Sequence, residues 1–341
     1  MADGKYVDHI TGNVFAVENG KISGEIGATG IAVVSQNPYM ELNTSNMTLE
    51  NSLAMNFWVY PSDLREDVSY TAELTRSYAD GSTDVDTVAM SDWTAVDAND
   101  DDVVDYYQIP YVGLAAKEMN DEIVIKIKDA GGTVVGEFTD SIRDYAEFMI
   151  KTYADNEDYA EFVTSMVDML NYGAAAQKEF GYDKANLANA GIEAYQHLAT
   201  KGTPKLEDSW AGNGIGYGSN LELKENIILH IWFKNAGVES AKITYKDHYG
   251  DEQNIVLNKS EFQVRMAGIS SVAIDTLVVA DGAQEITCTF YSQADAKGER
   301  IGEVTESVES YLKYMLEKDT NSNDLYVAIA KFIDSSYKSF H

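Results

Sequence analysis

The sequence is poor in cysteine and in long apolar runs. Cys288 is the only cysteine among 341 residues, so no disulfide can form within the chain. It lies in the alternating segment "EITCTFY", where a thiol acts as a small apolar residue. No apolar run approaches the roughly 18–20 residues that a membrane-spanning helix needs. We therefore expect neither a disulfide framework nor insertion into a membrane.

Positive charge is also scarce. The chain has 25 Lys and Arg against 56 Asp and Glu, which gives a formal net charge of −31. Nucleic acids and anionic membranes bind through basic patches, so we expect neither as a partner. A neutral ligand such as a sugar is not repelled and a cation is attracted, although the same charge also serves solubility.

A signal peptide is not visible either. The first residues, "MADGKYVDHI", show no basic segment followed by an apolar one. A processed protein would start in the same way, and chains without disulfides occur both in the cytosol and on the surface of anaerobic bacteria. The compartment stays open on this evidence.

An internal repeat organises the chain. The segment "GTVVGEFTDSIRDYAEFMI" (132–150) aligns without gaps with "GERIGEVTESVESYLKYML" (298–316). Upstream, "SNMTLENSLAMNFWVY" (45–60) matches "SNLELKENIILHIWFK" (219–234). Because the blocks occur twice in the same order, we interpret the chain as a duplicated unit with lobes at 1–200 and 201–341.

Each unit begins with short strands and ends with two helices. Runs rich in Val, Ile, Thr and Tyr, broken by Gly and Asp turns, predict an antiparallel β-sandwich. Apolar residues at helical spacing predict a helical hairpin after each sandwich, at about 141–153 and 157–180, then 307–317 and 324–340. Ser141 is a suitable N-cap and Gly181 a suitable C-terminal stop. The fold class is therefore α+β and bilobed. Residues 1–40 have no counterpart and could add strands to the first unit.

The segment "NYGAAAQKEFGY" (171–182) has almost no bulky side chains in its middle. Its small residues recur in part in "KFIDSSYKSF" (331–340). Small side chains let two backbones approach closely, so we expect a packing seam here rather than a binding face.

No catalytic motif is present. The chain lacks a nucleophile elbow, a phosphate-binding glycine loop, a zinc-type His pair and a Cys pair. Glycosidase chemistry needs only two carboxylates, and nothing in the sequence singles out one pair among so many. We expect a protein that is not an enzyme and has no catalytic residues.

One acidic segment has some of the spacing of a calcium loop. In "DANDDDVVD", Asp97, Asn99 and Asp101 occupy alternate positions, as calcium ligands do. The glycine expected next is Asp102, and the last position is Gln108 instead of a bidentate Glu. We therefore expect a solvated loop and no cofactor, with calcium as the alternative.

Tryptophans at matching positions differ from those at unmatched positions. Trp58 and Trp232 match each other within apolar alternation, so we expect them in the core. His230, which aligns with Asn56, is expected to face outward. Trp93 lies in an acidic segment, 91–107, which we interpret as an insertion in the first unit.

Trp210 and Trp93 are the leading candidates for ligand binding, because each lies in a polar segment. An exposed aromatic ring offers a flat apolar face to the C–H groups of a sugar, while nearby polar groups bond its hydroxyls. Structural packing is the alternative for each ring. The candidate ligand-binding residues are Trp210, Tyr217, Trp93, Tyr106, Tyr249 and Asn213.

The region "SIRDYAEFMI…MVDMLNYGAAAQKEFGYDKANLANAGI" (141–192) resembles a module of large secreted, cell-surface proteins of gut Firmicutes. The whole layout, a sandwich and helices occurring twice, is similar to the second starch-binding domain of the starch adherence system proteins of ruminococcal amylosomes. The resemblance covers most of the chain, residues 1–40 least. No binding residue is carried over from that family.

The resemblance implies a bilobed, non-catalytic, secreted domain associated with the cell surface. It implies binding of starch and other α-1,4-glucans in a groove, with other amylosome proteins as partners through parts outside this chain. Two alternatives stay open: a structural or protein-interaction module of a surface scaffold, and a glycoside hydrolase.

Overall fold

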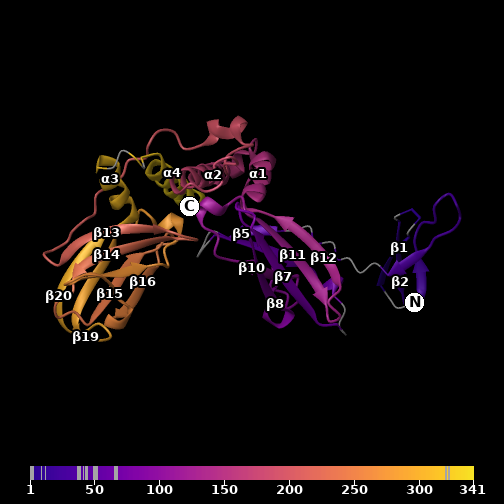
Figure 1. Ribbon diagram of the computed structural model, residues 1–341, viewed down its shortest axis with the longest axis horizontal. Coiled ribbons are helices and arrows are strands. Elements are labelled where there is room, and N and C mark those ends of the chain that lie inside the picture. The colour runs from indigo at the N-terminus through magenta and orange to yellow at the C-terminus, as the bar shows by residue number, and fades with distance from the viewer. Residues whose placement is uncertain are drawn as a thin grey trace.

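The structure is a computed structural model of the chain (Figure 1). It describes residues 4–8, 10–11, 13–36, 40, 42, 45–48, 53–64, 68–318, 321 and 323–341. This part of the chain contains five four-stranded antiparallel sheets and four α-helices. The predicted α+β class is confirmed.

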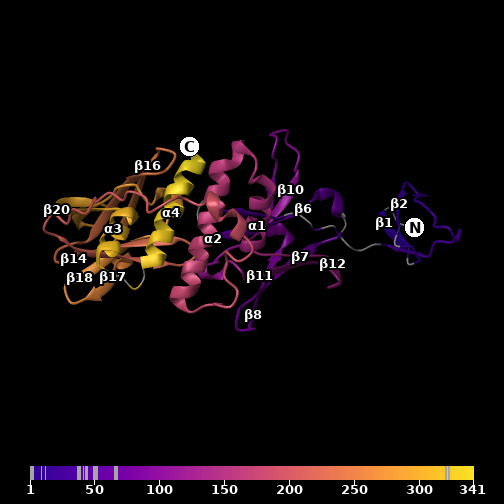
Figure 2. The ribbon, with the colours of Figure 1, turned by 90° about the horizontal axis from the view of Figure 1, so that it is seen from above.

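The first sheet is small and separate. Its strand order is β3-β2-β1-β4, with bounds Gly4–Asp8 (β1), Val14–Glu18 (β2), Lys21–Ser23 (β3) and Val34–Gln36 (β4). Tyr6, Phe15 and Val17 form its own core cluster. The sheet stands apart from the rest of the molecule in both views (Figures 1 and 2). The expectation that these residues add strands to the first unit is therefore wrong.

The first half of the remaining chain, from β5 to α2, has two sheets. One has the order β5-β6-β10-β9, with β5 Ser45–Thr48, β6 Ala54–Val59, β9 Thr94–Val96 and β10 Tyr106–Tyr111. The other has the order β12-β11-β7-β8, with β7 Tyr70–Ser77, β8 Thr83–Ala89, β11 Glu122–Asp129 and β12 Val134–Asp140.

The second half, from β13 to α4, also has two sheets. One has the order β13-β14-β18-β17, with β13 Gly216–Leu223, β14 Ile227–Lys234, β17 Gln263–Met266 and β18 Ile269–Ile274. The other has the order β16-β15-β19-β20, with β15 Ser240–Lys246, β16 Glu252–Asn258, β19 Ile286–Gln293 and β20 Lys297–Glu306.

Aromatic side chains join the two sheets of each half. Phe57 of β6 meets Phe138 of β12 edge to face, with ring centroids 6.2 Å apart. Phe233 of β14 stacks on Phe290 of β19 at 4.2 Å. Strand β7 alternates buried and half-buried residues along its whole length, which is the pattern of a strand with one face on a core.

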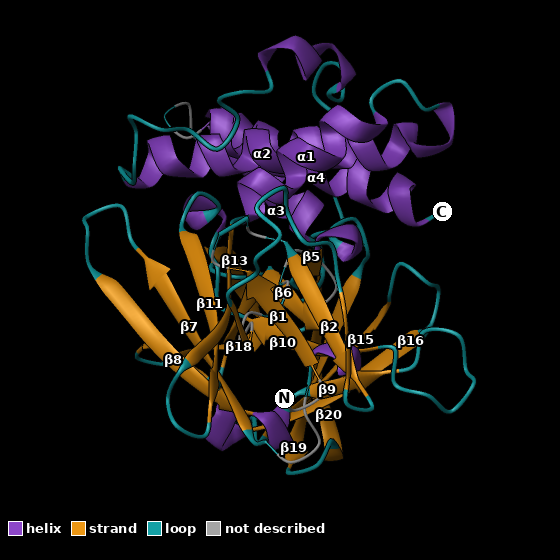
Figure 3. Ribbon diagram, turned by 90° about the vertical axis from the view of Figure 1, so that its right-hand side faces the viewer, coloured by secondary structure: helices purple, strands orange, loops and turns teal. Residues whose placement is uncertain are grey.

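The α-helices gather on one side of these sheets (Figure 3). Their bounds are Ile142–Tyr153 (α1), Ala160–Phe180 (α2), Val308–Lys318 (α3) and Asn323–Phe340 (α4), close to the predicted ranges. The Ser141 hydroxyl accepts a hydrogen bond from the Asp144 backbone N–H, and Gly181 ends α2 at φ 69°. Both predicted signals are thus confirmed. None of the helices in the described part is long and apolar enough to cross a membrane.

Helices α2 and α4 lie side by side between the two halves (Figure 2). The hydroxyls of Ser165 and Ser336 are 3.2 Å apart in the buried contact, and Tyr172 meets Phe332 with ring centroids 6.0 Å apart.

Gly173 of α2 packs closely against residues of the first half. A Cβ on Gly173 would lie 2.6 Å from Met119 Sδ and 3.1 Å from the Ala116 carbonyl oxygen. The stretch of small residues is therefore a place of close packing at Gly173, as predicted.

Replacing Gly173 by valine is expected to lower the free energy of unfolding by about 1–3 kcal/mol, because the new side chain overpacks the contact with Met119. Ala175→Val is the matched control, since Ala175 lies on the same helix but borders an open cleft between α2 and α4. Urea unfolding of both variants checks this, and an equal loss in the two would contradict the close approach at Gly173.

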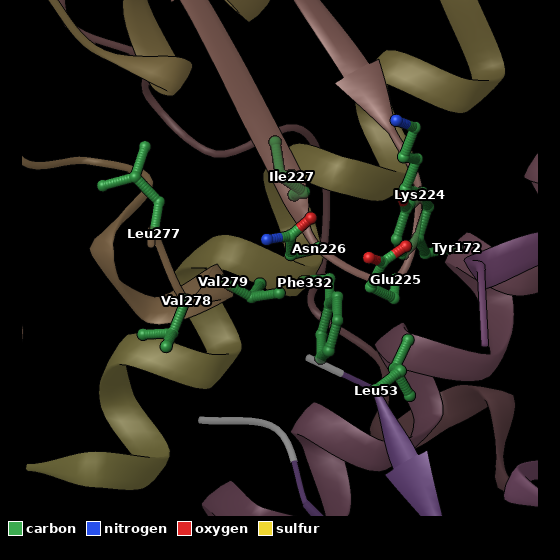
Figure 4. Close-up of a pocket in the computed structure, with 10 residues that line it drawn as sticks. All are labelled: Leu53, Tyr172, Lys224, Glu225, Asn226, Ile227, Leu277, Val278, Val279 and Phe332. Carbon is green, nitrogen blue, oxygen red and sulfur yellow. The ribbon is translucent and has the colours of Figure 1, made fainter. Parts of the chain in front are cut away.

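A small cavity lies where the two halves meet (Figure 4). Its volume is about 20 Å³, and Leu53, Tyr172 and Asn226 are among its lining residues. The Leu53 N–H also donates to the Glu225 carbonyl oxygen at 2.9 Å, which links the halves directly. The cavity holds about one water molecule, so it belongs to the junction and is too small for a ligand.

Candidate binding groove

Trp210 and Tyr217, two of the predicted residues, lie in one groove. The groove has a volume of about 400 Å³ and runs between β13 and α3, which contributes Ser310, Lys313 and Tyr314. Trp210 is 39% exposed, Tyr217 52% and Tyr314 57%, so the three aromatic side chains are all accessible from solvent. Aromatic faces and polar side chains therefore border one space.

The position of Trp210 is set by the next residue and by a glycine. The backbone N–H and C=O of Ala211 bond Thr305 of β20, each at 3.0 Å, which ties the loop to the sheet. The Trp210 N–H donates to the Asp208 carboxylate at 3.2 Å. A Cβ on Gly212 would lie 3.2 Å from the indole carbon Cζ2 of Trp210, so a glycine lets the backbone pass close to the ring.

Helix α3 supplies groove residues that the sequence reasoning missed. Ser310, Lys313, Tyr314 and Glu317 follow the spacing of one helix face, and all four border the groove. A tyrosine within this polar helix face, Tyr314, was the available sequence signal. The groove itself could not be read from local alternation or loop composition, because its other wall comes from β13, about 90 residues earlier in the chain.

The groove is rich in hydrogen-bonding groups and poor in positive charge. Burial raises the pKa of Glu306, whose carboxylate accepts hydrogen bonds from the Ser219 hydroxyl at 2.8 Å and the Ser307 N–H at 3.1 Å. Asp208 and Glu317 add negative charge, while Lys313 is the cation of the groove lining. These charges suit a neutral hydroxylated ligand better than an anion.

Trp232 lies beside this groove on the outer face of its sheet, and it is half-buried instead of being part of the core. Its ring is nearly parallel to that of Tyr217, at 7° and 6.4 Å between centroids. The indole N–H donates to Asn220 Oδ1 at 2.7 Å, and the Arg265 guanidinium lies 5.5 Å above the ring.

Trp58 occupies the matching position in the first half and is also half-buried on the outer face, with Tyr106 stacked on it at 4.3 Å. The expectation of a core position is wrong for Trp58 and Trp232. Each is preceded two residues earlier by a polar residue, Asn56 or His230. Side chains two apart in a strand share a face, so this alternation was the signal for the outer face.

Trp93 is a core residue, and its predicted ligand contact is wrong. Its side chain is 6% exposed, it meets Tyr107 edge to face, and its indole N–H donates to the Val88 carbonyl oxygen at 3.3 Å. Both Trp93 and Phe262 follow a 3-10 turn with the same backbone angles, φ −73° and −74° with ψ 138°. The similar segments "SDW" (91–93) and "SEF" (260–262), which end in these residues, were the sequence signal that Trp93 and Phe262 occupy equivalent positions.

The remaining predicted residues lie outside the groove lining. Tyr106 stacks on Trp58 in the first half. Tyr249 contacts His248 and Phe340, with ring centroids 4.0 Å and 6.1 Å away. Asn213 is exposed at φ 45° in the turn between Trp210 and β13. The structure does not bring these three side chains to Trp210 and Tyr217.

His230 lies on the outer face of its sheet, the face on which it was expected. It is nevertheless only 1% exposed, because Arg265 and Glu222 cover it. Arg265 has no acceptor, so the contact of its Nη2 with His230 Nδ1 at 2.8 Å makes Nδ1 the acceptor. His230 Nε2–H then donates to Glu222 Oε2 at 3.0 Å. The ring is therefore neutral.

Burial, together with the charge of Arg265, lowers the pKa of His230 below its ordinary value of 6.5. The unfolded chain therefore takes up the proton first, and stability falls as pH drops from about 6.5 towards the folded pKa, by at most about 1.4 kcal/mol per pH unit.

His230→Asn, which places in β14 the residue found at the matching position 56, removes the contribution of His230 to the pH dependence of stability. Thermal unfolding from pH 7.5 to 5 should show a steeper loss in the parent protein, while parallel curves would contradict this arrangement.

The acidic loop folds through its own backbone. Asp97 accepts hydrogen bonds from the N–H groups of Asn99, Asp101 and Asp102, at 2.7–3.3 Å. Asn99 Oδ1 accepts from the Asp101 N–H at 3.1 Å. Within the described residues, no group of three or more His, Cys, Asp or Glu side chains is arranged to hold a metal ion. The loop is exposed, as its composition predicts.

Comparison with known proteins gives no family assignment. No protein-family model matches the sequence, and no curated protein is significantly similar to it. The chemistry of the groove therefore carries the functional argument.

Proposed function

We propose that the chain is a non-catalytic carbohydrate-binding protein that holds α-1,4-glucan chains, such as those of starch, in the groove between β13 and α3. The observation that supports this most is the gathering of Trp210, Tyr217 and Tyr314 around one groove with their faces accessible. Apolar platforms combined with a few placed polar groups are the usual composition of a small-ligand site. The resemblance to amylosome starch-binding domains supports starch as the ligand.

The absence of catalysis is supported by how the groove carboxylates are used. Glu306 is 3% exposed and bonded to Ser219 and to the Ser307 N–H, while Asp208 accepts from the Trp210 N–H. A glycosidase needs one carboxylic acid and one carboxylate facing the scissile bond. Here Glu306 and Asp208 accept hydrogen bonds from the protein's own backbone and hydroxyl groups, and Glu317 is the remaining carboxylate of the lining. Release of reducing ends from starch by the purified protein would favour a hydrolase instead.

The proposed architecture is a duplicated unit, in which each copy is a β-sandwich followed by a helical hairpin, with lobes at 1–200 and 201–341. The two-sheet contacts of each half and the equivalent positions of Trp58 and Trp232 support it. By the same resemblance, the protein is proposed to act outside the cell at the cell surface, with starch as its partner there. Other amylosome proteins would associate through parts outside this chain.

Affinity electrophoresis tests the proposal. The protein is run in native gels with and without amylopectin, and beside them in gels with hydroxyethyl cellulose. Retardation by amylopectin alone is expected. Unchanged migration in amylopectin would reject glucan binding, and capture of surface proteins in a pull-down without retention on starch would favour the interaction-module alternative.

A further inference from the structure

A second groove adjoins the first at Tyr311. It has a volume of about 670 Å³, and Tyr311 of α3 borders both spaces. Strand β13 passes along both, with residues 217–219 at the first groove and 220–223 at the second. The strand is eight residues long, or about 26 Å. The two spaces therefore follow one another along a single strand.

The floor of the second groove carries fixed polar groups. Arg265 is held by the Ser271 hydroxyl, which accepts from its Nε at 2.8 Å, and by His230 Nδ1 at 2.8 Å. Glu222 is held by His230 and by Lys224, whose ammonium lies 2.8 Å from the carboxylate. Donors and acceptors that are already fixed lose little conformational freedom when they bind a ligand.

The wall of the second groove comes partly from the other half of the chain. Phe180, the last residue of α2, is 54% exposed and borders this space, as do Leu325 and Ile329 of α4. An exposed phenylalanine and fixed polar groups that border one space repeat the combination of apolar face and hydrogen-bonding groups found around Trp210. Both halves of the chain thus contribute to one continuous surface.

We propose that the second groove is an extension of the glucan site, in which Phe180 and Arg265 contact the sugar units beyond those held by Trp210 and Tyr217. This rests on the function proposed above. The site is then composite, built by both halves, and Phe180 and Arg265 set its preference for longer chains. A short oligosaccharide fills the first groove alone, while a longer one reaches past Tyr311.

Isothermal titration with maltotriose and maltoheptaose tests this. In the parent protein, maltoheptaose is expected to bind about tenfold more tightly than maltotriose, as one added contact region would give. Phe180→Ala and Arg265→Gln should each reduce that ratio several-fold and leave maltotriose affinity unchanged. Phe148→Ala is the matched control, because Phe148 is an exposed aromatic residue of α1, 62% exposed, outside both grooves.

The outcomes separate the two proposals. Equal affinity for both oligosaccharides in the parent protein, or an unchanged ratio in both variants, would overturn the extension while glucan binding stands. Binding of neither sugar would overturn the extension together with the proposed function. Arg265→Lys should restore part of the lost ratio, because a cation returns above Trp232.

Discussion

Replacing Trp210 by alanine is expected to weaken maltoheptaose binding about 30-fold, which corresponds to about 2 kcal/mol. The indole is the largest aromatic ring in the lining of the groove, and the hydrogen bonds between Ala211 and Thr305 hold the neighbouring backbone in place. A ring that is already fixed stacks on a ligand at little entropic cost. Isothermal titration measures the change directly.

The same experiment needs a variant that removes an aromatic ring elsewhere. Phe148→Ala serves here too, since Phe148 lies outside the groove lining. Tyr249→Ala is a second comparison, because Tyr249 is 60% exposed but packs on His248 and Phe340. Both should retain the parent affinity. A loss in Tyr249→Ala with none in Trp210→Ala would move the site to the β15–β16 hairpin.

Replacing Arg76 by alanine is expected to lower the free energy of unfolding by about 3–5 kcal/mol, the cost of breaking a buried ion pair. Arg76 is 5% exposed and lies 2.7 Å from both the Asp121 and Glu118 carboxylates. The Tyr182 hydroxyl donates to Asp121 at 2.7 Å, and burial raises the pKa of Tyr182 to about 12. Without Arg76, the two carboxylates remain close together, and Lys117, whose ammonium lies 3.8 Å from Glu118 and whose side chain is 36% exposed, is a weaker partner.

The loss should shrink as pH falls. Burial already raises the pKa of Asp121, and removal of the nearby cation raises it further. A carboxyl whose folded pKa exceeds its unfolded value binds protons preferentially in the folded state, so stability recovers on acidification. Urea unfolding at pH 7 and pH 5 should therefore show a smaller deficit at pH 5.

The control is Arg300→Ala. Arg300 pairs with Glu303, but its side chain is 58% exposed, so its removal should cost less than about 1 kcal/mol. Similar losses for Arg76 and Arg300 would show that the network around Asp121 contributes nothing beyond a surface ion pair.

Features that depend on local sequence were predictable. Ser141 and Gly181 mark the ends of helices because capping depends on side chains within one turn. The close approach at Gly173 was predicted from the lack of bulky side chains, because small residues let two backbones come close. Trp210 and Tyr217 were predicted together because both lie in one polar segment, and the structure places both at one groove, with Trp210 in the loop before β13 and Tyr217 on that strand.

Features that depend on which face of a strand is covered were missed. Trp93 reads as a loop residue from its acidic neighbours, but the 3-10 turn before it directs the ring into the core. Trp232 reads as a core residue from its apolar neighbours, but it shares a face with His230. Tyr314 joins the groove only through the packing of α3 on β13, which local patterns do not encode.

The most direct measurement is a crystal structure of the protein with maltoheptaose. Glucose rings stacked on Trp210 and Tyr217, with the chain continuing past Tyr311 towards Phe180, are the predicted result. A sugar bound elsewhere on the molecule, with the space between β13 and α3 free of ligand, would contradict the proposed site.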